Sequence, residues 1–151
     1  MCSSSIASLC VVYASNHTAS AASAAAHAAA SAVVHAAASK RVEGSEQQTA
    51  EAIKTNVVGS LNVARAAVER RVERVMGLSS DKACAPVLAY GAMKLLMEKA
   101  FVAPHGASRT MFACCRYGNV AGSAGSIIPV LLAQRGNASV QLRDERTTRF
   151  W

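Results

Sequence analysis

A run of four polar residues begins the part of the sequence whose side chains can do chemistry. The run is Ser79, Ser80, Asp81 and Lys82, and it follows a short apolar stretch at 75–78. Tyr90 stands eight residues after Lys82, and Lys94 stands four residues after Tyr90. Residues four apart share one face of a helix, so the spacing places an amine beside a phenol. An ammonium group lowers the pKa of a neighbouring phenol, and a tyrosine tuned in this way can take a proton from an alcohol.

Strands and helices are predicted around these residues from the apolar pattern. The first long helix begins near Ser45, where the sequence S-E-Q-Q offers a capping box, and runs to about Arg71. The second follows Pro86, carries the tyrosine and the lysine, and runs to about Val102. An apolar stripe on the first helix consists of Ile53, Val57, Leu61, Ala64 and Val68. The predicted strands are 31–35 and 110–116, both read as buried, with 72–79 and a small strand at 140–142, and 130–134 is predicted to be helical.

The order of these residues resembles the extended short-chain dehydrogenase/reductase superfamily. More narrowly, it resembles the nucleotide-sugar 4,6-dehydratases of polysaccharide biosynthesis, whose type member acts on UDP-N-acetylglucosamine. The family motif S-T-D-K-A-x-x-P corresponds to 79–86, and Y-G-A-T-K corresponds to 90–94. Further family motifs correspond to H-A-A-A at 35–38, the asparagine-bearing helix at 51–63, R-Y-G-N-V at 116–120, a Gly/Ser-rich loop at 122–129 and D-x-x-x-T-R-F-W at 144–151. The resemblance covers residues 33–151.

The resemblance implies an α/β fold, with a partial Rossmann-like parallel sheet flanked by helices. A complete dinucleotide fold opens with a G-x-G-x-x-G or G-x-x-G-x-x-G loop, and the first glycine of this sequence is Gly44. We therefore expect the chain to lack the glycine-loop half and to be the middle of a longer enzyme. Two parts are expected: residues 1–32, a low-complexity Ala/Ser-rich segment with little fixed structure, and residues 33–151, a partial NAD(P)-binding domain with the start of the substrate region. Within the first part, 6–13 could form a short strand and 19–32 a helix.

The resemblance also implies a catalytic cycle. Tyr90, helped by Lys94, takes the proton of the sugar's C4 hydroxyl while hydride leaves C4 for NAD or NADP. The C4 ketone acidifies the C5 proton, for which Lys82 is the candidate base. Asp81 is the candidate acid for the departing C6 hydroxyl, hydride returns to C6, and Ser80 hydrogen-bonds the C4 oxygen. Burial must keep Lys82 neutral when it acts. The alternative for Asp81 and Lys82 is an exposed turn pair.

Cofactor-binding and substrate-binding residues follow from the same resemblance. Small residues after the strand at 31–35 let a cofactor approach the backbone, and Asn56 either faces inward to hold backbone or water, or lies on the solvated face. The implied cofactor-binding residues are His35, Ala36, Ala37, Ala38, Lys40, Asn56, Ser79, Tyr90, Lys94 and Tyr117. The implied substrate-binding residues are Asn119, Ser123, Ser126 and Arg149. Ala85, Leu88 and Ala124 depart from the family pattern in the substrate region, so the sugar stays open.

Composition limits the other classes of function. The net charge of +7 comes mainly from arginines between 65 and 149, but no basic ribbon interleaved with aromatics supports a nucleic-acid partner. Five cysteines without a C-x-x-C pair and four scattered histidines predict no metal site and fit a reducing compartment. The adjacent Cys114 and Cys115 are expected to be small buried hydrophobes. No apolar run reaches the length of a membrane span, so no membrane partner is expected.

Three functional hypotheses remain from the sequence. The first is a nucleotide-sugar 4,6-dehydratase, or a sister epimerase, with homo-oligomerisation through the two long helices implied by the superfamily. The second is a non-catalytic truncated remnant or structural partner, because the pyrophosphate loop is missing. The third is a basic nucleic-acid-binding module. The expected location is the cytoplasm, with a plastid or other organelle left open, and the sequence does not distinguish NAD from NADP or give the stereochemistry at C5.

Overall fold

The computed structural model describes residues 9–12, 31–39, 42–103, 108–123 and 126–136, together with residues 106, 139 and 146. The chain forms two compact units, Met1–Arg116 and Tyr117–Trp151. The first unit contains the strands β1 (Leu9–Val12), β2 (Ala32–His35), β3 (Arg74–Leu78) and β4 (Met111–Cys115). Its helical segments are α2 (Val42–Gln47), α3 (Thr49–Ile53), a π-helical turn (Lys54–Val58), α4 (Gly59–Glu69), a 3₁₀ turn (Asp81–Ala83) and α5 (Ala89–Val102). The second unit contains α6 (Ile127–Ala133).

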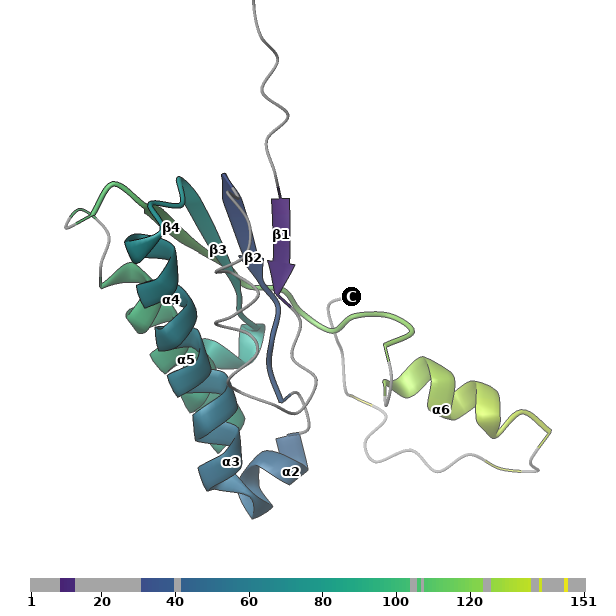
Figure 1. The fold of residues 1–151 in the computed structure, drawn as a ribbon. Coiled ribbons are helices and arrows are strands. Elements are labelled where there is room, and N and C mark those ends of the chain that lie inside the picture. The colour runs from purple at the N-terminus through teal and green to yellow at the C-terminus, as the bar shows by residue number, and fades with distance from the viewer. Residues whose placement is uncertain are drawn as a thin grey trace, which may run out of the picture. The chain divides into compact units, whose positions relative to one another are not determined.

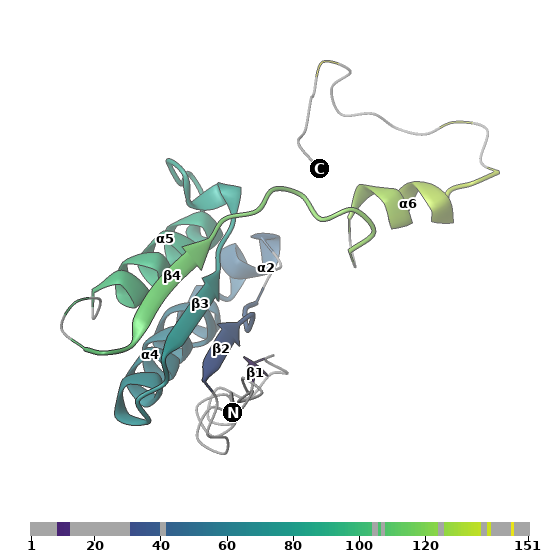
Figure 2. The ribbon, with the colours of Figure 1, turned by 90° about the horizontal axis from the view of Figure 1, so that it is seen from above.

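The four strands form one parallel sheet in the order β1-β2-β3-β4. The predicted α/β fold, with a partial Rossmann-like parallel sheet and flanking helices, is therefore confirmed (Figure 1). β1 lies inside the 6–13 segment for which a short strand was one prediction, so at least these four residues have a fixed place in the sheet. α2, α3 and α4 connect β2 to β3, and α5 connects β3 to β4. Because successive parallel strands advance in one direction, right-handed crossovers place α4 and α5 on the same face (Figure 2).

The core lies between this face of the sheet and the two long helices. Val33, Val75 and Phe112 occupy one level of the register, and their side chains are buried against α4 and α5. Phe101 of α5 is fully buried, with its ring 5.8 Å from that of Phe112. Burial of these large side chains supplies most of the hydrophobic stabilisation, at roughly 1.5–3 kcal/mol each.

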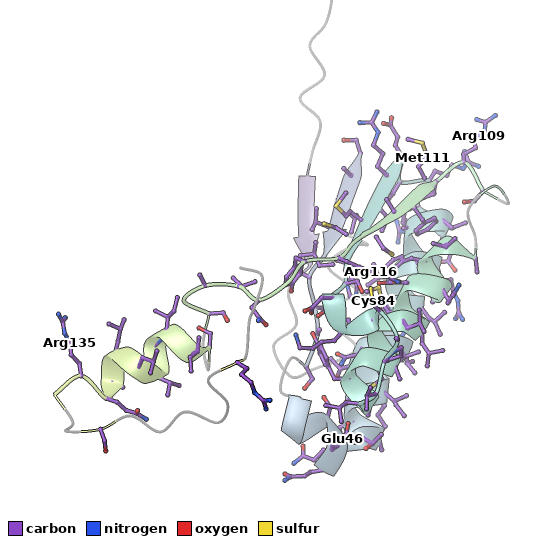
Figure 3. The ribbon with its side chains drawn as sticks, turned by 180° about the vertical axis from the view of Figure 1, so that it is seen from behind. Glu46, Cys84, Arg109, Met111, Arg116 and Arg135 are labelled. Atoms are coloured by element: carbon purple, nitrogen blue, oxygen red, sulfur yellow. The ribbon has the colours of Figure 1, made fainter. Side chains whose placement is uncertain are left out.

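The other face of the sheet is exposed in β3 and β4 and half-buried in β2, and this corrects two predictions. The strands at 31–35 and 110–116 were predicted to be buried runs. In the first, Ala32 and Val34 are only half-buried, and in the second, Met111 is exposed (Figure 3). Cys114 is half-buried and Cys115 is exposed, so they are not two buried hydrophobes. The reason is the period of a strand: neighbours point to opposite faces, and only one face meets the helices.

The long first helix is interrupted by a π-helical turn, and its buried face differs from the predicted stripe. Ile53 and Leu61 of that stripe are both 42% exposed. Ala64 of the stripe is buried in the core and Val68 packs against it, so the end of the stripe is confirmed. The other buried positions are mostly small or polar: Ala52, Asn56, Ser60, Val63 and Ala67. Small side chains let the helix approach closely, and the buried polar ones find hydrogen-bond partners across the fold.

The predicted capping box at Ser45 is wrong. Ser45 lies inside α2 and is fully buried, and the residue that precedes α3 is Gln48, whose side chain makes no capping hydrogen bond. The Thr49 hydroxyl donates to the Ser45 carbonyl at 3.0 Å, which ties the two short helices together. The helix from Pro86 to Val102 is confirmed as α5, and the helix predicted at 130–134 is α6, which starts earlier at Ile127.

Some predictions fall on residues outside the described part of the chain. These are most of the helix suggested at 19–32, of which only 31 and 32 are described and Ala32 begins β2, together with Lys40, the strand at 140–142 and Arg149. Among the residues that the structure describes, no helix is both long enough and apolar enough to cross a bilayer.

Gly77 generates a test of the core. A Cβ placed there would lie 2.8 Å from a ring carbon of Phe101 and 3.1 Å from the sulfur of Met97. We therefore expect Gly77→Ala to lower the free energy of unfolding by about 1–3 kcal/mol, because the buried helix has no room to move. Urea unfolding followed by circular dichroism measures this change.

Gly59→Ala is the matched control for this substitution. Gly59 has helical backbone angles, and an added Cβ would meet only the Lys54 carbonyl oxygen at an ordinary 3.5 Å. The alanine should raise stability by about 0.5–1 kcal/mol through helix propensity. Equal and small effects at both glycines would contradict the packing described here.

Candidate functional site

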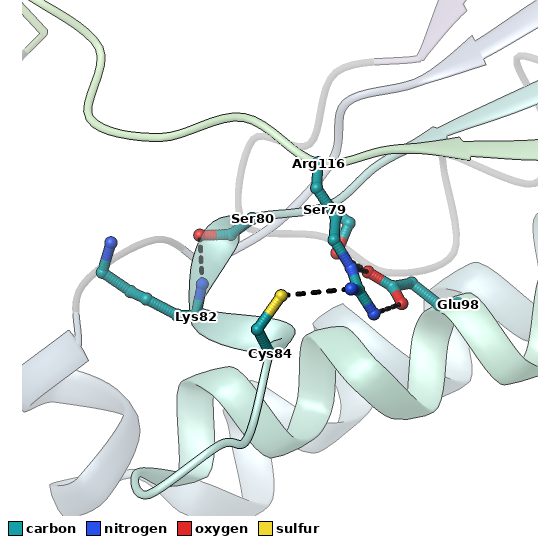
Figure 4. A network of polar contacts seen from close by, with 6 residues as sticks. All are labelled: Ser79, Ser80, Lys82, Cys84, Glu98 and Arg116. Carbon is teal, nitrogen blue, oxygen red and sulfur yellow. Dashed lines mark hydrogen bonds and ion pairs between the residues drawn. The ribbon is translucent and has the colours of Figure 1, made fainter. Parts of the chain in front are cut away.

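The Ser79–Lys82 run leaves the carboxyl end of β3 and turns at once into the 3₁₀ turn. The amide of Ser79 still donates to the Cys115 carbonyl at 2.7 Å, so the sheet ladder holds the start of the run. Ser80 has an extended backbone, and its hydroxyl accepts from the amide of Lys82 at 3.3 Å (Figure 4). Capping by Ser80 therefore fixes where Asp81 and Lys82 leave the sheet.

Ser80, Asp81 and Lys82 form one hydrogen-bonded group. The Ser80 hydroxyl donates to Asp81 Oδ1 at 2.8 Å, and Lys82 Nζ donates to the same oxygen at 3.0 Å. Partial burial raises the pKa of the Asp81 carboxyl, but the hydrogen bonds from Lys82 and Ser80 more than offset it, so the pKa lies below its usual value. Asp81 is thus a carboxylate paired with the Lys82 ammonium. The Asp81 side chain is 48% exposed and the Lys82 side chain 39% exposed, so without a ligand Lys82 lacks the burial that was expected to neutralise it.

Helix α5 brings Tyr90 and Lys94 to this turn. Glu46 of α2 contributes to its placement, because Glu46 Oε1 accepts from the amide of Ala89, the first residue of α5, at 2.6 Å. A carboxylate at a helix N-terminus is favoured by the unpaired amides and the helix dipole. Sequence reasoning assigned Glu46 to the start of its own helix and missed this contact.

Gly91 sets how closely α5 approaches the turn. A Cβ at this position would lie 2.2 Å from the Lys82 carbonyl oxygen, a distance that no side chain can occupy. The helix backbone next to Tyr90 therefore lies directly against the backbone of Lys82. Tyr90 itself is buried.

Lys94 is buried and has a shifted pKa. Its Nζ donates to the Leu78 carbonyl at 2.8 Å, which joins the middle of α5 to the last residue of β3. Burial lowers the pKa of Lys94 to about 8, although the nearby Cys114 and Glu98 oppose this shift. A lysine with this pKa is partly neutral just above neutral pH, which suits proton transfer with a phenol.

A second polar network lies behind the turn, and sequence reasoning did not find it. The buried Ser79 hydroxyl donates to Glu98 Oε1, and Arg116 donates to both Glu98 oxygens at 2.8 and 2.7 Å. Arg116 also donates to the Cys84 sulfur at 3.1 Å (Figure 4). The one available signal was spacing, because Glu98 follows Lys94 by one helical turn and shares its face.

The H-A-A-A segment follows β2 at the same edge of the sheet. The His35 side chain faces the core, where Nε2 and the Ser60 hydroxyl are 2.9 Å apart, and burial lowers the pKa of His35 to about 4. The Ser60 hydroxyl donates to the Asn56 carbonyl at 2.7 Å, so His35 Nε2 carries the hydrogen. Ala37 is buried, while Ala36 and Ala38 are half-buried. A role for this segment in cofactor binding stays a prediction.

Asn56 faces inward, as one of the two sequence alternatives proposed. Its Oδ1 accepts from the amide of Ser39 at 2.7 Å, and its Nδ2 donates to the Ser39 carbonyl at 3.1 Å. The amide therefore clamps the backbone just after H-A-A-A. Asn56 lies in the π-helical turn, and such turns are frequent at functional sites.

The remaining predicted residues belong to the second unit. Tyr117 is exposed, and Asn119, Ser123 and Ser126 are half-buried in the loop before α6, where the amide of Ser126 donates to the Ser123 carbonyl at 2.8 Å. Their roles in binding stay predictions. Lys40 and Arg149 lie outside the described residues. Over the described ranges, no three His, Cys, Asp or Glu side chains gather in a way that could hold a metal ion.

The Lys94 ammonium is a donor at this edge that suits one end of a dinucleotide. It lies at the carboxyl end of a parallel strand, where open α/β sheets bind nucleotides, whereas the Ser79 and Ser80 hydroxyls already donate to Glu98 and Asp81. One of the three N–H groups of the Lys94 ammonium donates to Leu78, so the group can also serve a ribose hydroxyl. An ammonium at this position fits the ribose of a nicotinamide riboside.

The fold and the site define a class of protein. A parallel sheet whose strand end carries a Ser-Asp-Lys turn, packed on a helix with tyrosine and lysine one turn apart, is the arrangement of Rossmann-like short-chain dehydrogenases/reductases. The chain belongs to a family within this class that is described as polysaccharide biosynthesis protein, which it matches over residues 4–151. This match begins well before residue 33, where the sequence motifs alone placed the start of the resemblance.

Three known proteins illustrate the similarity. The UDP-N-acetylglucosamine 4,6-dehydratase (inverting) of Campylobacter jejuni is 46% identical over 112 residues, which are 71% of this chain and 34% of that enzyme. The UDP-glucose 4-epimerase of Rickettsia bellii is 43% identical over 104 residues, which are 66% of this chain and 30% of the epimerase. MoeE5 in complex with UDP-glucuronic acid and NAD is 26% identical with a TM-score of 0.66, over 70% of this chain and 41% of MoeE5. The chain thus spans about a third of the length of its curated relatives.

Gly91 provides a test of the junction between α5 and the turn. We expect Gly91→Ala to lower the free energy of unfolding by about 1–3 kcal/mol, because the new Cβ must push the Lys82 backbone away. The amide signals of residues 80–83 should shift most in two-dimensional NMR spectra. A variant with unchanged stability and unchanged signals in this turn would contradict the close approach.

Lys94 gives a pH dependence with a defined sign. Its pKa is about 8 in the folded state and 10.5 ordinarily, so between these values the unfolded chain holds more protons. Stability should therefore rise with pH across this window, by at most about 3 kcal/mol from this group. Urea unfolding at steps from about pH 7 to about pH 10.5, compared with Lys94→Met, isolates the contribution. A constant difference between the two proteins across the window would refute it.

Proposed function

We propose that this chain carries the proton-transfer groups of a nucleotide-sugar 4,6-dehydratase, or of a sister 4-epimerase, that works in polysaccharide biosynthesis by transient hydride transfer at sugar C4. The substrate class is a nucleotide sugar such as UDP-N-acetylglucosamine. Residues 33–151 form, in this proposal, a partial NAD(P)-binding domain with the start of the substrate region. The similarity to a dehydratase and to an epimerase of nucleotide sugars supports this assignment.

One observation carries the proposal. Tyr90 and Lys94 are both buried on α5, and Gly91 holds that helix against the turn that bears Ser80, Asp81 and Lys82. In the proposed reaction Tyr90 accepts the proton of the C4 hydroxyl, with Lys94 favouring the phenolate. The Ser80 hydroxyl steadies the C4 oxygen. Bound NAD or NADP would accept the hydride from C4 and later return it.

The ion pair of Asp81 and Lys82 gives a route to the expected acid and base. The charged pair is joined by a 3.0 Å hydrogen bond, and transfer of one proton along it converts a carboxylate and an ammonium into a carboxylic acid and an amine. These neutral forms are the ones that protonation of the C6 oxygen and removal of the C5 proton require. A sugar bound over the half-exposed pair would desolvate it, and desolvation favours the neutral forms.

The outer face of the helices supports a homo-oligomer. Ile53, Leu61 and Leu96 are exposed apolar side chains on the helical segments that cover the sheet. Exposed apolar side chains on packed helices are a frequent feature of subunit contacts. We propose that a second copy of the protein covers this strip.

The function is tested by turnover with a control at Tyr90. The protein is incubated with UDP-N-acetylglucosamine and NAD, and NMR follows loss of the C6 hydroxymethyl signals and gain of a C6 methyl group. We expect conversion by the wild type and a loss of about 10²–10⁴-fold in Tyr90→Phe, because general acid–base catalysis contributes about that much. Equal rates in both proteins would defeat the role of Tyr90.

Cofactor binding separates this function from the other hypotheses. Calorimetric titration with NAD and with NADP should give saturable binding, weakened in Lys94→Met. Absence of nucleotide binding and of turnover would favour a non-catalytic protein. Salt-sensitive binding to DNA without nucleotide binding would favour a nucleic-acid-binding module.

A further inference from the structure

We propose that Glu98 and Arg116 are positioning residues of this site, whose ion pair holds Ser79 at the end of β3 and sets the charge that faces Lys94. The inference rests on the proposed function for its catalytic meaning. The two residues come from different elements, Glu98 from α5 and Arg116 from the position after β4. Arg116 binds the Glu98 carboxylate, and that carboxylate accepts from Ser79, two residues before the turn (Figure 4).

The geometry of the pair is that of a rigid clamp. Arg116 uses Nε and one terminal nitrogen for the two oxygens of Glu98, a bidentate arrangement that fixes both side chains. The Glu98 side chain is only 11% exposed, while that of Arg116 is 44% exposed. The hydrogen bond from Arg116 lowers the pKa of Glu98, so Glu98 remains a carboxylate. The clamp joins β3, α5 and the end of β4 behind the proposed catalytic turn.

Glu98 also acts on Lys94 through charge. Tyr90, Lys94 and Glu98 follow one another at four-residue steps along α5, so they share one face. The carboxylate favours the charged form of Lys94, and it therefore raises the pKa of Lys94 against the larger effect of burial. Arg116 partly cancels this influence, because its positive charge sits on the same carboxylate.

The other titratable groups named near Lys94 are uncharged in the pH range where Lys94 titrates, so Glu98 is the anion that acts on it. His35 of β2 is neutral near pH 8, because its pKa is lowered to about 4. Cys114 of β4 can favour the charged form of Lys94 only as a thiolate, and burial raises the pKa of its thiol, so the thiol is neutral as Lys94 titrates.

This arrangement predicts opposite shifts for two substitutions. Glu98→Gln removes the anion and leaves Arg116 charged, so the titration midpoint of Lys94 should fall by about half a pH unit or more. Arg116→Met removes the cation and leaves the carboxylate uncancelled, so the midpoint should rise. The double variant should return toward the wild type. A clamp with only a structural role would admit water when broken and move the midpoint upward in both single variants.

The experiment is an NMR titration of the full chain with isotope-labelled lysine, with the Lys94 signal assigned by its loss in Lys94→Met. Glu98→Asp keeps the charge and should hold the midpoint close to that of the wild type, even where the shorter side chain lowers stability. Glu51→Gln is the matched control: Glu51 makes an exposed 2.7 Å ion pair with Lys54, and its loss should leave Lys94 unchanged.

The result is independent of turnover. Opposite shifts in Glu98→Gln and Arg116→Met, with none in Glu51→Gln, support the positioning role. Shifts in the same direction, or no shift in either variant, overturn it. Failure of the wild type to bind NAD or to convert a nucleotide sugar would instead contradict the proposed function. The NMR titration of Lys94 could still be measured and interpreted in that case. Where turnover is present, the optimum pH should move with the Lys94 midpoint in each variant.

Discussion

The contact between the backbone of α5 at Gly91 and the carbonyl of Lys82 is the constraint on which the rest of the site depends. Without a side chain at Gly91 the helix can lie directly on the turn that follows β3. The helix then delivers Tyr90 and Lys94 to the end of that strand, and Lys94 reaches the Leu78 carbonyl at 2.8 Å. A bulkier residue would separate the two elements that carry all the proposed proton-transfer groups.

Charge is organised around this junction in two layers. The first layer is the half-exposed ion pair of Asp81 and Lys82 in the turn after β3. The second layer is the bidentate pair of Glu98 on α5 and Arg116 after β4, and Glu98 holds the buried Ser79 hydroxyl. Lys94 is bound to the Leu78 carbonyl next to this pair. Burial lowers the pKa of Lys94, and the Glu98 carboxylate limits that shift. Burial and named neighbours thus set the direction in which the pKa values of Asp81, Glu98 and Lys94 move.

Close packing by small residues explains most of the differences between the predicted and the observed fold. The apolar spacing on the first helix favoured a face containing Ile53 and Leu61, yet the buried face carries Asn56, Ser60 and Ala67. Asn56 and Ser60 gain their burial from partners far along the chain, Ser39 and His35. Such partners have no signature in local periodicity, and the same holds for Glu46, whose carboxylate caps another helix.

The sequence by itself determined the α/β class, the helix that follows Pro86 and ends near Val102, and the family, because motif order and spacing are local properties of the chain. It also determined which residue types could transfer protons. Only the tertiary structure decided which face of each helix and strand is buried, that Glu98 and Arg116 meet behind the turn, and how far the pKa of Lys94 moves. These features depend on contacts between elements distant in sequence, and the energy of a buried charge depends on everything packed around it.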